Sequence, residues 1–238
     1  MTAILMKKKH IVFLFLSVIL TTSTPSQEKL YVFYPSTLHF QSMQDSMTNS
    51  IQGISITVFD RYDSFSDKMK TDPPNAIITK PMLIKQQFNN YKVLLKGERN
   101  GITEEKYVLV SIEKPITVES VNTETVIGVI DILGRAGMKS FLKQYFPLEP
   151  KLKKVSKIGD LLPLLSFDFA SGIMIEDIFL DYFKSTSQLK FAVTSLTGSK
   201  NGIVAFALKK DGNAEKTLAS LKKNNKAICE LFYIDQWK

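Results

Sequence analysis

Short apolar runs alternate with amphipathic stretches along the first third of this chain. Residues 30–34 (LYVFY), 54–58 (ISITV) and 76–79 (AIIT) have the length and composition of buried strands. After the first run, apolar residues recur at helical spacing: Phe40, Met43, Met47 and Ile51. A second helix is expected between Asp60 and Pro73. Because strands joined by helical crossovers form parallel sheets, this alternation predicts an α/β fold.

The same alternation returns in the second half of the chain. Residues 126–130 (VIGVI) and 172–175 (GIMI) are predicted strands. The helices expected after them have apolar stripes: Met138, Phe141, Leu142, Tyr145 and Phe146 in the first, and Ile175, Ile178, Phe179, Tyr182 and Phe183 in the second. Strands at 189–193 and 203–208 and a helical C-terminus complete the pattern.

The middle of the chain differs from both halves. Residues 92–95 and 107–112 are predicted strands, separated by a polar stretch that contains Asn100-Gly101, a hairpin-type turn signal. Glu104-Glu105 is expected in this polar loop. The pattern predicts two lobes without a flexible linker between them. Lobe 1 is predicted to comprise residues 27–110 and 200–238, and lobe 2 residues 111–199.

The N-terminus has the three parts of a secretory signal peptide. Lys7, Lys8 and Lys9 precede the apolar run 11–20, and small or polar residues follow to Ser26. Ten apolar residues span only about half of a ~30 Å hydrocarbon core. Residues 1–26 are therefore predicted to be a signal peptide and the protein periplasmic; the alternative is an uncleaved membrane anchor.

Composition argues against several classes of protein. The chain has two histidines, His10 and His39, and one cysteine, Cys229, too few for a His/Cys metal site or an intrachain disulfide. No nucleophile elbow, Walker loop or zinc-protease motif occurs, so neither catalysis nor a cofactor is expected. The net charge of +8 is scattered, which argues against nucleic-acid binding. The densest run, Lys151 to Lys157, is interpreted as a solvated loop or strand edge.

Several segments resemble the type II periplasmic solute-binding proteins of ABC importers. Residues 107–116 (YVLVSIEKPI) look like the first crossover between lobes of that family, and 126–129 (VIGV) like the start of its second lobe. Residues 167–177 (FDFASGIMIED) resemble its ligand-contacting segment, and 201–211 (NGIVAFALKKD) its return strand. The polar link 97–106 and the closing helices look closest to the phosphate/phosphonate-type branch.

This resemblance implies two mostly parallel sheets flanked by helices, with a ligand cleft between the lobes. It also implies a monomer that captures a small anionic solute by lobe closure and presents it to a membrane permease. One departure keeps a second hypothesis open. Where phosphonate-type relatives have a run of Ser and Thr, residues 133–137 (LGRAG) have no hydroxyl. The alternative is a degenerate binding-protein fold, acting as a sensor or interaction subunit for a partner such as a histidine kinase.

A cleft between two α/β lobes brings strand carboxyl ends and helix N-termini to the ligand. Four turns therefore provide the predicted ligand-binding residues: Tyr34, Ser36 and Thr37; Tyr62 and Ser64; Thr79 and Lys80; Gly134 and Arg135. Glu176, after a fifth strand, is added to them.

Each polar candidate has a second interpretation. Ser36 and Thr37 are expected to donate to an oxyanion or to cap a helix. Lys80 either neutralises an anion or is a solvated loop lysine. Arg135, bracketed by two glycines, is the strongest candidate because its guanidinium can grip a carboxylate or phosphate. Glu176 is expected to accept from a ligand amine or to pair with Arg135; the simpler interpretation is an acid at a helix N-terminus that interacts only with the helix dipole.

Overall fold

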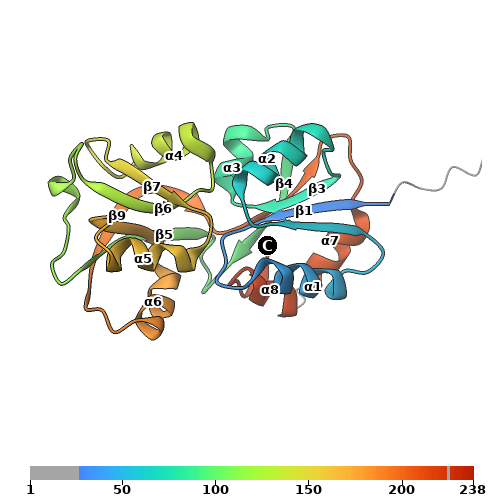
Figure 1. Cartoon of the computed structure of the whole chain (residues 1–238). Coiled ribbons are helices and arrows are strands. Elements are labelled where there is room, and N and C mark those ends of the chain that lie inside the picture. The colour runs from blue at the N-terminus through green and yellow to red at the C-terminus, as the bar shows by residue number, and fades with distance from the viewer. Residues whose placement is uncertain (1–26, 224–225) are drawn as a thin grey trace, which may run out of the picture.

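Two β-sheets, each flanked by helices, form two lobes side by side (Figure 1). The computed structural model describes residues 27–223 and 226–238. The predicted signal peptide lies outside these residues. No helix within the described ranges is both long enough and apolar enough to cross a membrane.

Lobe 1 contains a six-stranded sheet in the order β11-β4-β10-β3-β1-β2. Its strands are β1 (Lys29–Phe33), β2 (Ser55–Phe59), β3 (Ala76–Thr79), β4 (Tyr91–Glu98), β10 (Ala205–Lys209) and β11 (Gln236–Trp237). The first three are parallel to one another, whereas β10 pairs antiparallel with both β3 and β4. The helices are α1 (Phe40–Ser50), α2 (Tyr62–Thr71), α3 (Pro81–Gln87), α7 (Glu215–Lys222) and α8 (Lys226–Leu231).

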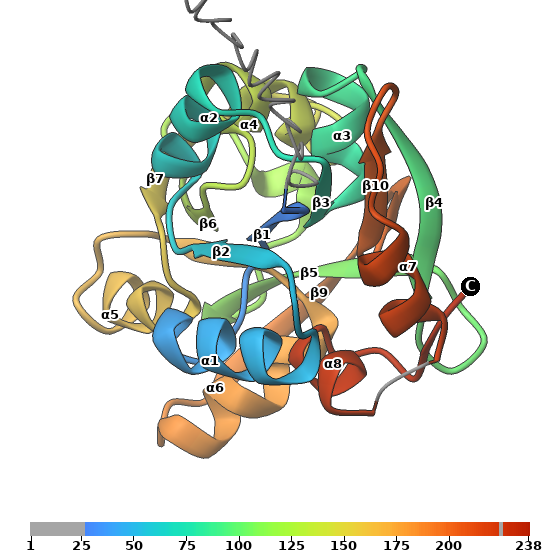
Figure 2. The same ribbon diagram turned by 90° about the vertical axis from the view of Figure 1, so that its right-hand side faces the viewer.

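The two faces of this sheet bury different helices (Figure 2). Leu30 and Val32 belong to a cluster with α1 and α8, whereas Tyr31 and Phe33 belong to one with α2 and α3. This division follows from the two-residue period of a strand. Cys229 is buried in the first of these clusters.

Lobe 2 contains a five-stranded sheet in the order β7-β6-β8-β5-β9. Its strands are β5 (Glu104–Ile112), β6 (Val126–Ile130), β7 (Lys151–Val155), β8 (Gly172–Glu176) and β9 (Phe191–Gly202). Its helices are α4 (Gly134–Leu142), α5 (Leu161–Ser166) and α6 (Leu180–Thr186), with short 3₁₀ turns η1 (Val118–Ser120), η2 (Ile158–Asp160) and η3 (Asp177–Phe179). The lysine-rich stretch begins with β7, which lies at one edge of this sheet. A strand edge is one of the two interpretations that the sequence allows for this stretch.

The chain crosses between the lobes at 99–103 and again at 203–204. The predicted turn exists: Asn100 and Gly101 have φ of 50° and 75°, and Arg99 bridges to Ile102. Beyond that bridge the two strands diverge, because β4 pairs within lobe 1 and β5 within lobe 2. The first crossing therefore precedes the predicted boundary at residue 110. Glu104 and Glu105 begin β5 instead of lying in a loop.

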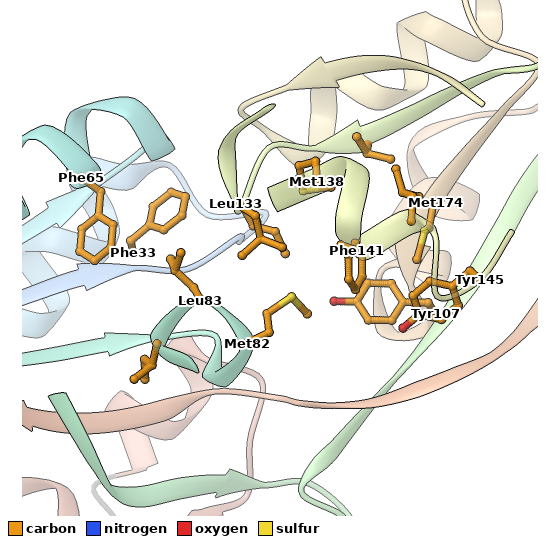
Figure 3. Close-up of a cluster of buried hydrophobic side chains, with 14 of the residues drawn as sticks. Phe33, Phe65, Met82, Leu83, Tyr107, Leu133, Met138, Phe141, Tyr145 and Met174 are labelled. Atoms are coloured by element: carbon orange, nitrogen blue, oxygen red, sulfur yellow. The ribbon is translucent and has the colours of Figure 1, made fainter. Parts of the chain in front are cut away.

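One hydrophobic cluster joins the lobes (Figure 3). Phe33 and Met82 come from lobe 1, whereas Leu133, Phe141 and Tyr107 come from lobe 2, and all five are buried. In Figure 3, Met82 reaches from α3 toward Phe141 and Tyr107. Apolar burial of this kind stabilises the contact between the lobes.

Candidate functional site

A cavity of about 230 Å³ lies between the lobes. Lobe 1 contributes the segment from Phe33 to Phe40 and the end of β2, including Asp60. Lobe 2 contributes the end of β6, the segment from Ser156 to Asp160, and Tyr182. The cavity therefore lies at the carboxyl ends of parallel strands, where ligands bind in open α/β sheets.

The wall of this cavity carries groups of both charges. From lobe 1 come the Ser36 and Thr37 hydroxyls and the Asp60 carboxylate, and from lobe 2 come Lys157 and Asp160. Such a wall can donate hydrogen bonds to one part of a solute and accept them from another. A solute bound here would contact both lobes at once.

The hydroxyls of Ser36 and Thr37 are already engaged within lobe 1. The Tyr233 hydroxyl lies 3.1 Å from Ser36 Oγ and 2.7 Å from Thr37 Oγ1, and it accepts from Thr37 N at 3.0 Å. Neither residue caps α1, because His39 Nδ1 accepts from Gln41 N instead. Since a hydroxyl forms more than one hydrogen bond, Ser36 and Thr37 keep capacity for a solute.

Lys80 is buried and lies in a group of charged residues where the lobes meet. Its side chain is 1% exposed, and Nζ lies 3.0 Å from Glu105 Oε1 and 2.7 Å from Glu176 Oε1. Arg99 Nη1 approaches Glu105 Oε2 at 3.3 Å. We call Lys80, Arg99, Glu105 and Glu176 the junction ion cluster. Glu176 thus pairs with Lys80 and not with Arg135, and Lys80 is not a solvated loop lysine.

The two carboxyl groups of this cluster titrate far apart. Burial raises the pKa of Glu176 well above its ordinary value, despite Lys80, and Glu105 adds to this effect. Burial acts on Glu105 too, but Lys80, a hydrogen bond from Glu176 and Arg99 outweigh it and lower the pKa of Glu105 to about 2. Glu105 is therefore the more acidic of the two carboxyl groups and is ionised at neutral pH.

The other predicted residues lie in three different places. Tyr34 lines the cavity, and its ring lies 4.6 Å from Lys80 Nζ. Thr79 is fully buried in β3 and Ser64 is exposed on α2. Arg135 is exposed and lines an open hollow with Lys139 and Glu149 instead of the cavity.

Gly134 and Tyr62 form a contact between the lobes. The Tyr62 ring packs on Gly134 so closely that a Cβ there would lie 2.5 Å from ring Cε1. The Tyr62 hydroxyl donates to Gln87 Oε1, and Gln87 Nε2 donates to Leu133 O at 2.8 Å. Protein groups, not an open space, therefore face the start of α4.

We expect Gly134→Ala to destabilise the protein more than Gly101→Ala does. Both glycines have a left-handed φ, +68° and +75°, which costs an alanine about 1–2 kcal/mol. Only Gly134 faces a close neighbour, since nothing lies within 4 Å of a Cβ at Gly101. Urea unfolding of both variants measures the difference in stability. Equal losses of stability would show that the Tyr62 ring does not restrict the side chain at position 134.

Sequence reasoning missed several residues that the structure brings to this region. Glu105 and Arg99 complete the junction ion cluster, and Lys157, Asp160 and Tyr233 border the cavity or contact its wall. The sequence contained a hint for Lys157, because this residue ends the basic run and follows a predicted strand edge. Within the part of the chain that the structure describes, no group of three or more His, Cys, Asp or Glu residues is placed to hold a metal ion.

The two sheets, their strand orders and the inter-lobe cavity define the two-lobed fold of the periplasmic binding proteins. No family model matches the chain, and no curated protein matches it. PhnD1 from Prochlorococcus marinus, in complex with methylphosphonate, is similar over 89% of this chain and 92% of its own, with a TM-score of 0.65 and 12% identity. A mutant of ArgBP from T. maritima is similar over 86% and 95%, with a TM-score of 0.57 and 16% identity. The periplasmic VFT2 domain of Bordetella pertussis BvgS is similar over 86% and 92%, with a TM-score of 0.50 and 11% identity.

These likenesses confirm the predicted two-lobed α/β fold class. The sheets differ from the prediction in one respect, because both are mixed and not mostly parallel. At the 11–16% identity of these three structures, the likenesses show the fold alone. Only one of the three is described as a phosphonate complex, so the phosphonate-type branch is not singled out.

Proposed function

We propose that this chain is an extracytoplasmic solute-binding protein, with a small solute held in the cavity between its lobes. The observation that carries the proposal is the cavity itself, walled by both lobes at the carboxyl ends of β1, β2, β6 and β7. A solute that contacts both walls stabilises the closed form, because only that form satisfies both sets of polar groups. The similar structures are binding proteins and not enzymes, which also supports this reading.

The cavity fits a small, polar solute. A volume of about 230 Å³ lies below the range of drug-sized sites. Lys157 suits the anionic group that we predict for the solute, and Asp60 and Asp160 suit a hydrogen-bond donor elsewhere on it. An ABC importer is the proposed partner, and a periplasmic location follows from this role.

A thermal-shift screen with phosphate, phosphonates, carboxylates and amino acids tests this function. We expect one class of solute to raise Tm in a concentration-dependent way, by mass action. Lys157→Ala should weaken binding of that solute about tenfold or more, since it removes a charged hydrogen-bond donor from the wall. Lys184→Ala, an exposed lysine on α6 outside the cavity, is the matched control. Equal affinities of the two variants would argue against the cavity as the site.

The apolar contact between the lobes favours a second candidate function. Phe33 and Met82 pack in one cluster with Leu133 and Phe141, so apolar packing joins the two lobes. A permanently closed protein suits an interaction or sensor subunit for a membrane partner, such as a kinase. Small-angle scattering decides between the two: a receptor changes its radius of gyration with its solute, whereas a permanently closed subunit does not.

A further inference from the structure

The two sheets have four edge strands between them: β11 and β2 in lobe 1, and β7 and β9 in lobe 2. The outer side of an edge strand exposes backbone N–H and C=O groups that can pair with another strand. Proteins commonly protect such edges with very short strands, charged side chains or a covering element. Within the described ranges, three of these four edges are protected in one of these ways, whereas β9 is not.

Each protected edge uses a different device. The strand β11 has only two residues. On β2, the Gln44 side chain of α1 donates to Ile56 O at 3.0 Å and accepts from Val58 N at 2.7 Å. Gln44 thus occupies backbone groups that a further strand would use. The strand β7 carries three exposed lysines among its five residues, and lysines on an edge discourage pairing.

The strand β9 has none of these devices along residues 191–198 (FAVTSLTG). This stretch contains no charged residue and no proline. Among the described residues its backbone pairs with β5 alone, and the register is regular between 191 and 196. The side chains of Val193, Ser195 and Thr197 are exposed, Val193 by 40%. A long, uncharged strand edge therefore faces the outside of lobe 2.

The sequence of this edge is self-complementary about Thr194. In an antiparallel pair related by a two-fold axis at this residue, Thr194 lies opposite Thr194 of the second copy, and Phe191 opposite Thr197 of the second copy. Thr–Thr pairs and aromatic–β-branched pairs are favourable across strands. Pairing about the next residue would instead place Lys190 opposite Lys200, two like charges. A second copy of this chain thus fits the edge in one register.

We propose that β9 is a dimerisation edge, which pairs antiparallel with β9 of a second copy about Thr194. The two five-stranded sheets then form one continuous sheet, and both exposed edges are satisfied at once. No residue of β9 lines the cavity between the lobes, so this inference goes beyond the proposed function and does not depend on it. It replaces the monomer that the family resemblance implies.

Sedimentation of the protein over a range of concentrations tests the dimer. Wild type is expected to show a monomer–dimer equilibrium. Ser195→Lys should weaken the dimer about tenfold or more, because it places two lysines diagonally across the axis. Ser185→Lys is the matched control, since it adds the same charge at an exposed serine of α6, and it should dimerise as wild type does.

Two results of this experiment overturn the proposal. One is a wild type that stays monomeric up to about 1 mM, which would leave the edge of β9 to a strand of another protein. The other is a dimer that Ser195→Lys and Ser185→Lys form equally well, because such a dimer uses a different surface.

Oxidative cross-linking tests the register. Directly opposite residues of antiparallel strands have Cα atoms about 4.5–5.5 Å apart, which a disulfide can bridge. Thr194→Cys is therefore expected to form a covalent dimer, and the native Cys229 is buried. The two copies of Thr197 are six positions apart along the paired strands, roughly 20 Å, so Thr197→Cys should not cross-link. Equal cross-linking of the two variants, or none in either, overturns pairing about Thr194.

Discussion

Replacing Lys80 with methionine is expected to lower the free energy of unfolding by about 3 to 5 kcal/mol. The ammonium group lies within 3.0 Å of oxygens from both Glu105 and Glu176 and is almost fully buried. Methionine fills similar space but leaves the ionised Glu105 carboxylate in a region of low dielectric, with Arg99 as the remaining positive charge of the junction ion cluster. Urea unfolding measures the loss.

Lys139→Met is the control for this prediction. Lys139 also forms an ion pair, with Glu149 at 2.6 Å, but the two side chains are 51% and 35% exposed. An exposed pair contributes only about 0 to 1 kcal/mol. Adding Glu105→Gln to Lys80→Met should recover part of the lost stability. Similar losses for Lys80→Met and Lys139→Met would contradict a buried ion cluster between the lobes.

Phe141→Ala is also expected to lower the free energy of unfolding, by about 3 to 5 kcal/mol. Phe141 is buried in α4, and its ring meets those of Tyr107 and Tyr145 edge-on, with centroids 5.3 Å apart in each case. Its removal leaves a cavity in the cluster that joins the lobes. Chemical denaturation gives the cost.

Phe167→Ala provides the comparison, because Phe167 is 68% exposed on the loop after α5. That change should stay within about 0.5 kcal/mol. If Phe141→Ala were equally mild, the apolar contact between the lobes would not stabilise the fold.

The sequence predicted the fold correctly where the periodicity of apolar residues was strong. The runs at 30–34 and 126–130 became β1 and β6, and the stripe of Met138, Phe141 and Leu142 became the buried face of α4. The crossing between lobes was misplaced for a physical reason. Asn100-Gly101 specifies a tight turn but does not specify whether the strands on either side stay paired.

The candidate site was much less predictable. Lys80 ends an apolar strand, which fits either a ligand contact or a solvated loop, and its partner Glu105 belongs to the other sheet. Only the packing of the two lobes brings them together. Arg135 follows Gly134 by one residue, about 100° around the helix, so when Gly134 faces Tyr62 the Arg135 side chain is turned to another surface.

A crystal structure with the most strongly stabilising solute of the screen tests the central claim most directly. The account predicts the solute in the cavity between the lobes, in contact with Thr37 or Asp60 on one side and with Lys157 or Asp160 on the other. A solute bound outside this cavity, or touching one lobe alone, would contradict it.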